Sequence, residues 1–319
     1  MKFPMVSVVV PVYNGRNTIE NCIKSVLNLE YPKSRLEIVV VDNDSRDGTV
    51  KMLKKYTKHI ILLHLKKRGM SNARNFGIVN SSGEIIVSID ADCIIDRRWI
   101  KNIIGVFGDK KIGAATGIFL SHTPARRIER YFDRYCIKYY QPSFDGRNTH
   151  LQTSIAAFRK EIFYEIGYFD VDVDSAEDMD ISERILDRGY KIKFVKKSVL
   201  YHKNRTSVNG FIKQAYRDGK SYAYFSMKYK GGLREKDCEM ARRNLKSSHL
   251  IALFISRLFI SIFKKCDDLY VWGPIYSYIQ TKSYTLGYMM GRFYKRLFFM
   301  HSLFCTFIII NKIFVRCIW

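Results

Sequence analysis

The chain contains, at residues 84–92, the segment Glu84-Ile85-Ile86-Val87-Ser88-Ile89-Asp90-Ala91-Asp92, in which a short apolar run ends in two carboxylates. Such a run is typical of a strand that is buried on both faces of a sheet. Positions i and i+2 of an extended chain point the same way, so Asp90 and Asp92 face one side of the strand end. Hard oxygen ligands of this kind suit Mg²⁺ or Mn²⁺. A solvated acidic turn has the same pattern, and the three residues alone leave both interpretations open.

On both sides of this segment, short apolar runs alternate with helical patterns. Strands are predicted at Val6–Val12, Glu37–Val41, Ile60–Leu65, Glu84–Ile89 and near Ile112–Phe119. Helices are predicted at Asn17–Asn28, from Asp47-Gly48-Thr49 onward, at Ser71–Asn80, near Arg98–Val106 and at about Pro124–Tyr140. Asn17 and Glu20 have the spacing of a capping box at the start of the first helix. The alternation predicts an α/β fold with a Rossmann-like, mostly parallel sheet flanked by helices, whose ligand lies beyond the carboxyl ends of the strands.

The composition points to an anionic partner. The 319 residues include 54 Lys+Arg and 30 Asp+Glu, a net charge of +24, which suits nucleic acid, anionic lipid headgroups or phosphorylated small molecules. The seven cysteines include no C-x-x-C pair, which argues against a zinc site and a disulfide framework and favours a reducing cytosol. The sequence up to Val10 has no apolar export signal, so we expect a cytoplasmic catalytic part.

Several motifs occur in a fixed order along the first two thirds of the chain. They are Val6–Gly15, Glu37–Thr49 with Asp42-Asn43-Asp44, Gly69–Asn75, Gly83-Glu84, Asp90-Ala91-Asp92, Ala156–Arg159, Ile166–Asp170, and Glu177–Asp180 with Arg184 and Gly189–Ile192. Over about residues 4–220, this order and spacing resembles glycosyltransferase family 2, whose members are inverting enzymes of the GT-A fold. The resemblance implies a hexosyltransferase-type glycosyltransferase that uses a nucleoside-diphosphate-sugar.

The resemblance assigns a group of residues to the nucleotide-sugar: Pro11, Val12, Tyr13, Asp42, Asn43, Arg74, Asp90, Ala91 and Arg205. Tyr13 is expected to pack near the base or ribose, and Arg74 and Arg205 to meet the diphosphate. An aspartate is commoner in the family at the position of Asn43, so UDP is favoured but not secured. An amide can still serve a base edge as donor and acceptor. For Arg74, a surface position without function is an equally open interpretation.

The resemblance also assigns the metal and the base. Asp92, Asp90 and His202 are expected to hold Mn²⁺ or Mg²⁺ against the diphosphate. Asp178 resembles the family's general base, with Glu177 holding the acceptor or sharing the role. Two structural interpretations stay open: carboxylates at the start of a helix are favoured by its dipole, and a single histidine is often structural.

The chain changes character after residue 200. Residues 201–319 contain 21 Lys+Arg and 6 Asp+Glu, interleaved with Tyr and Phe. Leu250–Phe263 is largely apolar, and Arg257, Ser261, Lys264 and Lys265 form one polar stripe on the helix predicted there. Leu297–Ile310 is shorter than the roughly 20 apolar residues of a membrane span. We therefore expect a catalytic domain at 1–220, divided near 120 into nucleotide-sugar and acceptor sides. The basic, aromatic region 221–319 is expected to form helices that associate with an anionic membrane surface. Packing of these helices on the catalytic domain or on a second subunit is the alternative.

Together these observations predict a metal-dependent glycosyltransferase at the cytoplasmic face of a membrane, held there peripherally or monotopically. Its acceptor is expected to be a glycan or a polyprenyl-linked molecule, and homo-oligomers are compatible with the sequence. A sugar nucleotidyltransferase is an alternative because it also combines a nucleotide-binding sheet with acidic metal ligands. A basic nucleic-acid-binding protein is another, although no nucleic-acid-binding fold signature supports it. We expect no nucleic-acid partner.

Overall fold

The computed structural model describes residues 3–122, 130, 151–173, 177–202 and 208–229. Within them, eight strands form one sheet in the order β3-β2-β1-β4-β7-β6-β8-β5. The strands are β1 (Val6–Val12), β2 (Leu36–Asp42), β3 (Ile61–His64), β4 (Ile85–Ile89), β5 (Cys93–Ile95), β6 (Ile112–Ser121), β7 (Ile155–Arg159) and β8 (Lys191–His202). The helices are α1 (Ile19–Leu27), α2 (Thr49–Leu53), α3 (Met70–Val79), α4 (Trp99–Ile104), α7 (Ile162–Ile166), α8 (Glu177–Asp187) and α9 (Val208–Lys228), with short 3₁₀ turns at 33–35, 54–56 and 105–108.

The N-terminal half of the sheet is parallel, as predicted. β1 lies between β2 and β4, and β3 pairs with the outer side of β2, all in parallel register. All seven residues of β1 are buried, which agrees with an unbroken apolar strand covered on both faces. The carboxyl ends of β1, β2 and β4 therefore meet at one edge, where Tyr13, Asn43 and Asp90 follow them.

The other half of the sheet is mixed rather than parallel. β7 pairs antiparallel with both β4 and β6, β6 pairs parallel with β8, and β5 pairs antiparallel with β8. The fold is therefore α/β with a parallel half and a mixed half. β5, β7 and β8 were not predicted as strands, and the mixed pairing explains why alternation along the sequence did not reveal them.

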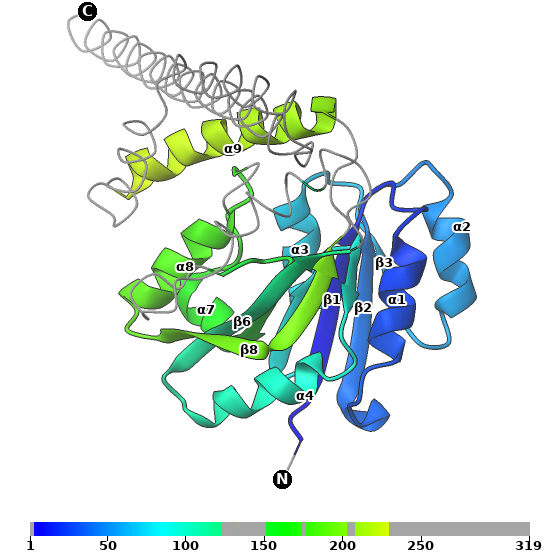
Figure 1. Ribbon diagram of the computed structural model, residues 1–319, viewed down its shortest axis with the longest axis horizontal. Coiled ribbons are helices and arrows are strands. Elements are labelled where there is room, and N and C mark those ends of the chain that lie inside the picture. Colours follow the sequence, from blue (N-terminus) through cyan, green and yellow to red (C-terminus); the bar gives the residue numbers. More distant parts are fainter. Residues whose placement is uncertain (1–2, 123–129, 131–150, 174–176, 203–207, 230–319) are drawn as a thin grey trace, which may run out of the picture. The chain divides into compact units, whose positions relative to one another are not determined.

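Helices cover both faces of the sheet (Figure 1). One buried apolar cluster joins alternate residues of β1 and β2 to residues of α1, α2 and α4, including Ile23, Leu53 and Trp99. The second joins the opposite face to α3, α7 and α8, including Ile78, Phe163 and Ile181. Burying side chains of this size contributes about 1.5–3 kcal/mol each, so the sheet is a rigid platform for the loops at its edge.

The start of the first helix differs from the predicted capping box. The helix begins at Ile19, Thr18 precedes it without a side-chain cap, and Asn17 lies outside it. Glu20 instead pairs with Lys24 at 3.1 Å and accepts a hydrogen bond from Tyr56 at 2.9 Å. The capping-box prediction was wrong because Glu20 finds these partners.

The chain separates into two compact units, 1–206 and 207–319. The expected boundary near residue 220 falls inside α9, which is continuous from Val208 to Lys228. Searched over the described residues, no helix combines the length and the apolar character that a membrane crossing requires. The predicted helix at 124–140 and the segments 250–263 and 297–310 lie outside the described residues.

Candidate active site

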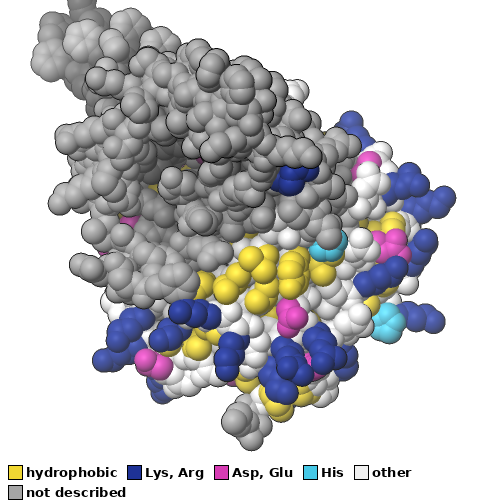
Figure 2. Space-filling model, viewed as in Figure 1, with side chains coloured by type: hydrophobic (Ala, Val, Ile, Leu, Met, Phe, Trp, Pro, Cys, Tyr) yellow, Lys and Arg dark blue, Asp and Glu magenta, His cyan; other side chains and the backbone are white. Residues whose placement is uncertain are grey.

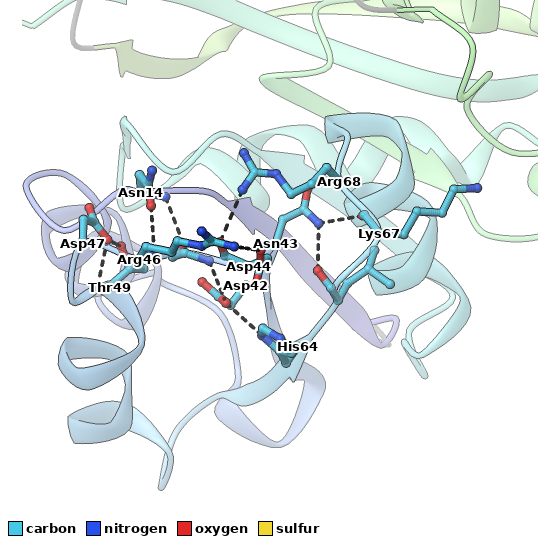
Figure 3. Close-up of polar contacts among 12 residues, drawn as sticks. Asn14, Asp42, Asn43, Asp44, Arg46, Asp47, Thr49, His64, Lys67 and Arg68 are labelled. Atoms are coloured by element: carbon cyan, nitrogen blue, oxygen red, sulfur yellow. Dashed lines mark hydrogen bonds and ion pairs between the residues drawn. The ribbon is translucent and has the colours of Figure 1, made fainter.

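Two loops at the carboxyl edge of the sheet are joined by side-chain hydrogen bonds (Figure 3). After β1, the Asn14 side-chain oxygen accepts from the Arg46 backbone N–H at 2.9 Å, and the Asn14 N–H donates to the Ser45 hydroxyl at 2.9 Å. Asp47 accepts from the backbone N–H groups of Arg16 and Thr49, each at 3.0 Å. Burial opposes ionisation of Asp47, but these hydrogen bonds hold its pKa below the usual value. The β1 and β2 loops therefore form one preorganised wall.

Asp42, the last residue of β2, is buried under this wall. Its side chain is 1% exposed, and its Oδ2 lies 3.0 Å from Nδ1 of the half-exposed His64 at the end of β3. Its Oδ1 is buried and finds no hydrogen-bond partner among the described residues. Asp42 thus lies at the bottom of the site and contacts His64 from the neighbouring strand.

Asn43 is 4% exposed, and its side chain is bonded to the loop that precedes α3. The two amide N–H groups donate to the carbonyls of Leu65 at 2.9 Å and Lys67 at 2.8 Å, and the side-chain oxygen accepts from the Gly69 N–H at 2.9 Å. Both hydrogens that we expected to serve a base edge are therefore used within the protein.

Pro11, Val12 and Tyr13, at and just after the end of β1, were assigned to the nucleoside, and of these only Tyr13 is open to solvent. Pro11 and Val12 are buried, and Val12 belongs to the first apolar cluster. The Tyr13 side chain faces Arg68, whose guanidinium carbon lies 3.1 Å from the centre of the ring. Arg68 also donates to the carbonyl of Asp44 at 3.3 Å. The Tyr13–Arg68 pair and the Asn43 hydrogen bonds therefore involve the same loop, residues 65–69.

Arg74 links the end of β4 to the start of α8. Its side chain is 1% exposed and donates to Asp90 Oδ1 at 2.6 Å and to Glu177 Oε1 at 2.5 Å. Glu177 also accepts from the Thr153 hydroxyl at 3.0 Å. Burial opposes ionisation of Glu177, but Arg74 outweighs it and holds the pKa below its usual value. For Asp90, burial prevails over Arg74 and raises the pKa. Arg74 is thus neither a surface residue nor pointed at solvent.

Asp92 and His202 come together from different strands. His202 Nε2 lies 3.3 Å from Asp92 Oδ2, and the His202 ring packs on Phe119 with centroids 5.0 Å apart. Potential ligand atoms of Asp92, Cys93 and His202 all lie within 4.8 Å of one another. Burial, assisted by Asp92 and Asp90, raises the pKa of the Cys93 thiol, and a protonated thiol is a poor ligand. A carboxylate and an imidazole fit Mn²⁺ or Mg²⁺ and leave coordination positions for phosphate and water.

Asp178 is the second residue of α8, next to Glu177. Its Oδ1 accepts from the Met179 N–H at 2.8 Å, so the helix start orients the carboxylate. Asp180, by contrast, is buried and pairs with Arg184 at 2.7 Å. Arg184 donates in turn to the carbonyls of residues 166–168. Asp180 and Arg184 therefore fix the helix, whereas Glu177 contacts Arg74 and Asp178 follows it at the helix start.

The sequence predicted most of the residues that lie at this edge of the sheet, but it missed several. Arg68 was missed, although it ends the cationic run Lys66-Lys67-Arg68 just before a motif glycine. Thr153 and His64 were also missed, because a single threonine and a strand-end histidine give no local signal. Ala91 lies between the two aspartates and is partly buried. Arg205 lies outside the described residues.

Comparison with known proteins places this edge in context. Residues 7–167 match the family model described as Glycosyl transferase family 2. The glycosyltransferase AglE of Haloferax volcanii is 29% identical over 223 residues, covering 68% of this chain and 72% of that protein. The poly-β-1,6-N-acetyl-D-glucosamine synthase of Staphylococcus aureus is 30% identical over 215 residues, covering 64% of this chain but only 51% of the synthase. The match thus spans about half of that relative.

Solved structures have the same fold. The mannosyltransferase PcManGT from Pyrobaculum calidifontis, in complex with GDP-Man and Mn²⁺, superposes with a TM-score of 0.64 at 20% identity, covering 91% of this chain and 88% of that one. TarS 1–349 of S. aureus in complex with UDP-GlcNAc gives a TM-score of 0.51 at 17% identity, covering 92% of both chains.

Proposed function

Because the chain belongs to glycosyl transferase family 2, we propose that it transfers a sugar, with inversion, from a nucleoside-diphosphate-sugar to a glycan or lipid-linked acceptor at a membrane. That it is a glycosyltransferase follows from the family match and its named relatives. The donor, the cation, the acceptor and the membrane belong to the proposal. A UDP-sugar is the favoured donor. The GDP-Man and UDP-GlcNAc held by the two structural neighbours support a nucleotide-sugar donor in general.

One observation carries the proposal: a single buried guanidinium, that of Arg74, contacts both Asp90 and Glu177. Asp90 is the first residue of the Asp90-Ala91-Asp92 motif, and Glu177 directly precedes Asp178. The carboxylates assigned to the donor and to the acceptor are therefore held on one rigid connection. This connection supports the proposal, because an in-line displacement requires donor and acceptor groups that are held in a fixed relation.

Each residue then has a distinct role. Asp92 and His202 would hold Mn²⁺ or Mg²⁺, which when bound stabilises the negative charge on the departing nucleoside diphosphate. Asp178 takes the proton of the acceptor hydroxyl as that oxygen attacks the anomeric carbon. Glu177, kept ionised by Arg74, favours the positive charge that develops on the sugar ring in an oxocarbenium-like transition state. Tyr13 supports the nucleoside through its exposed ring.

A donor screen tests the proposal. UDP-, GDP- and dTDP-sugars are incubated with the full chain, a mixed-lipid acceptor extract and Mn²⁺ or Mg²⁺, and release of nucleoside diphosphate is followed. We expect Asp178→Asn to bind donor normally but to lose about 10²–10⁴-fold in kcat, the usual contribution of general-base catalysis.

Two further measurements complete the test. Asp92→Asn is expected to lose the response of turnover to added cation, and calorimetry should show weaker Mn²⁺ binding in the absence of acceptor. Release of pyrophosphate instead of nucleoside diphosphate would indicate a nucleotidyltransferase and refute the proposed reaction. Full activity of Asp178→Asn would remove the base assignment alone.

A further inference from the structure

Asn43 uses its whole side-chain amide on one loop, residues 65–69, although it stands where the donor base would be expected to contact it. Its two N–H groups and its oxygen bond to the backbone of Leu65, Lys67 and Gly69 at 2.8–2.9 Å, and the residue is buried. Three hydrogen bonds from one buried amide fix the path of a loop that otherwise exposes Lys66, Lys67 and Arg68. What remains of Asn43 for a ligand is one lone pair on an oxygen beneath that loop.

The same loop carries the side chain that covers Tyr13. Arg68 lies 3.1 Å above the ring centre, and its guanidinium reaches the Asp44 carbonyl at 3.3 Å. Figure 3 shows Asn43 bonded to the loop that carries Lys67 and Arg68, and Arg68 reaching Asp44. A planar guanidinium stacks on aromatic faces and also pairs with anions, so a nucleotide approaching Tyr13 meets Arg68 first.

We propose that Asn43 is a positioning residue of the donor site, which holds the 65–69 loop so that the Tyr13–Arg68 pair, rather than the Asn43 amide, receives the nucleotide. This rests on the proposed function, since the ligand is taken to be a nucleoside-diphosphate-sugar. Arg68 must swing off or slide along the ring when a base stacks there, and it then stays beside the bound nucleotide because its loop is fixed.

The chemistry of position 43 gives the proposal a sharp consequence. An aspartate, the commoner family residue here, is isosteric with asparagine but has no N–H to donate. One carboxylate oxygen could still accept from the Gly69 N–H, but the other would replace the amide nitrogen and face the carbonyl oxygens of Leu65 and Lys67, which leaves two acceptors unpaired and adds repulsion. If residue 43 read the base, an aspartate would preserve or improve the binding of a uracil N–H. If residue 43 holds the loop, an aspartate releases it.

The experiment compares Asn43→Asp with the wild-type full chain in two ways. Donor KM and kcat are measured with the nucleotide-sugar that the wild type uses, and the chain is digested briefly with trypsin, with cleavage after Lys66, Lys67 and Arg68 quantified by mass spectrometry. We expect donor KM to rise about tenfold or more, equivalent to about 1.4 kcal/mol, with kcat within about threefold. Cleavage in the loop should accelerate at least as much, because a released loop opens more often.

Two other variants make the result interpretable. Asn80→Asp is the matched control, because Asn80 is exposed and its amide makes a single hydrogen bond to Phe76 within its own helix; it should behave as wild type in both assays. Arg68→Gln leaves the buried amide untouched and should raise donor KM like Asn43→Asp, which keeps the test valid if Asn43→Asp folds poorly.

The possible outcomes separate this proposal from the proposed function. An unchanged KM for Arg68→Gln, or a protected loop in folded Asn43→Asp, overturns the positioning role. So does an Asn43→Asp chain that changes its preference among UDP-, GDP- and dTDP-sugars without faster loop cleavage, because that result identifies a base reader. If the wild type releases no nucleoside diphosphate from any donor, the proposed function fails, while the digestion still reports whether Asn43 holds the loop.

Discussion

At the scale of single residues, the site depends on a buried charge cluster. Arg74 is almost fully buried between Asp90 and Glu177, and its Nε has no hydrogen-bond partner in the described residues. A buried cation with two carboxylates is stable only as a set, since loss of one member leaves the others without compensation. Arg74 therefore ties Asp90 to Glu177.

Replacement of Arg74 by methionine should be strongly destabilising. The change leaves the buried Glu177 and the partly exposed Asp90 without their counter-ion, and we expect a loss of about 3–5 kcal/mol in the free energy of unfolding. Urea denaturation followed by circular dichroism measures it. The double variant Arg74→Met, Glu177→Gln should regain part of the loss, because it removes one of the uncompensated charges. If the free energy of unfolding of Arg74→Met lies within about 1 kcal/mol of the wild-type value, the prediction fails, because water then compensates the charges that are left.

The sequence predicted which residues lie at the site where those residues belong to motifs that follow one another in a fixed order. Asp92 and His202 were expected at one metal site, and the structure brings them within 3.3 Å. The partners of Arg74 and Asn43 were not predictable, because all of them lie 16 or more positions away in the sequence. Glu177 is 103 positions from Arg74, and Lys67 is 24 positions from Asn43. Such pairings depend on where the chain returns in space, and no local pattern records them.

At the scale of elements, α3 connects the two sides of the site. Arg74 reaches Glu177, and the neighbouring Asn75 donates to the Phe169 carbonyl at 2.8 Å and accepts from the Phe169 N–H at 3.0 Å. The helix can do so because it lies close to the sheet at Gly77. A Cβ built on Gly77 would lie 2.4 Å from Val9 Cγ1 and 3.1 Å from Val41 Cγ2, so glycine is required there by space.

Gly77→Ala should therefore move α3 away from β1 and β2. We expect a destabilisation of about 1–3 kcal/mol, the usual cost of overpacking a core, together with lower turnover because Arg74 and Asn75 move with the helix. Thermal unfolding and donor turnover measure the two effects. Gly105→Ala is the matched control, since a Cβ there meets nothing within 4 Å. Equal stability of the two variants would contradict the close packing of α3.

The sequence predicted the elements of the parallel half better than those of the mixed half. β1 was predicted with its observed bounds, because five of its seven residues are valines, which favour strands. β8 was missed because four lysines interrupt its apolar pattern. Its buried residues, Ile192, Ser198 and Leu200, all lie on one face of the strand. β5 has three residues and exists only through its pairing with β8. Strands of this kind are stabilised by tertiary pairing rather than by local propensity.

At the scale of the whole molecule, charge is distributed unevenly along the chain. Residues 201–319 hold 21 of the 54 basic residues but only 6 of the 30 acidic ones. We propose that this region binds an anionic membrane surface on the cytoplasmic side, where it brings the site to a lipid-linked acceptor. Figure 2 shows Lys and Arg side chains also spread over the described surface of the first unit, so net charge alone is the competing explanation.

Charge reversal in the two regions separates these explanations. The triple variant Arg257→Glu, Lys264→Glu, Lys265→Glu reverses the predicted polar stripe, and each basic residue near an anionic surface contributes about 1 kcal/mol. We expect sedimentation with phosphatidylserine-containing vesicles to weaken by about two orders of magnitude or more. Lys51→Glu, Lys54→Glu, Lys58→Glu makes the same change in net charge at exposed positions of the first unit and should bind almost as wild type. If both triple variants lose binding equally, attraction depends on total charge, and the C-terminal region has no special part in it. If neither does, binding to the vesicles does not depend on these basic residues, and the proposed electrostatic attachment fails.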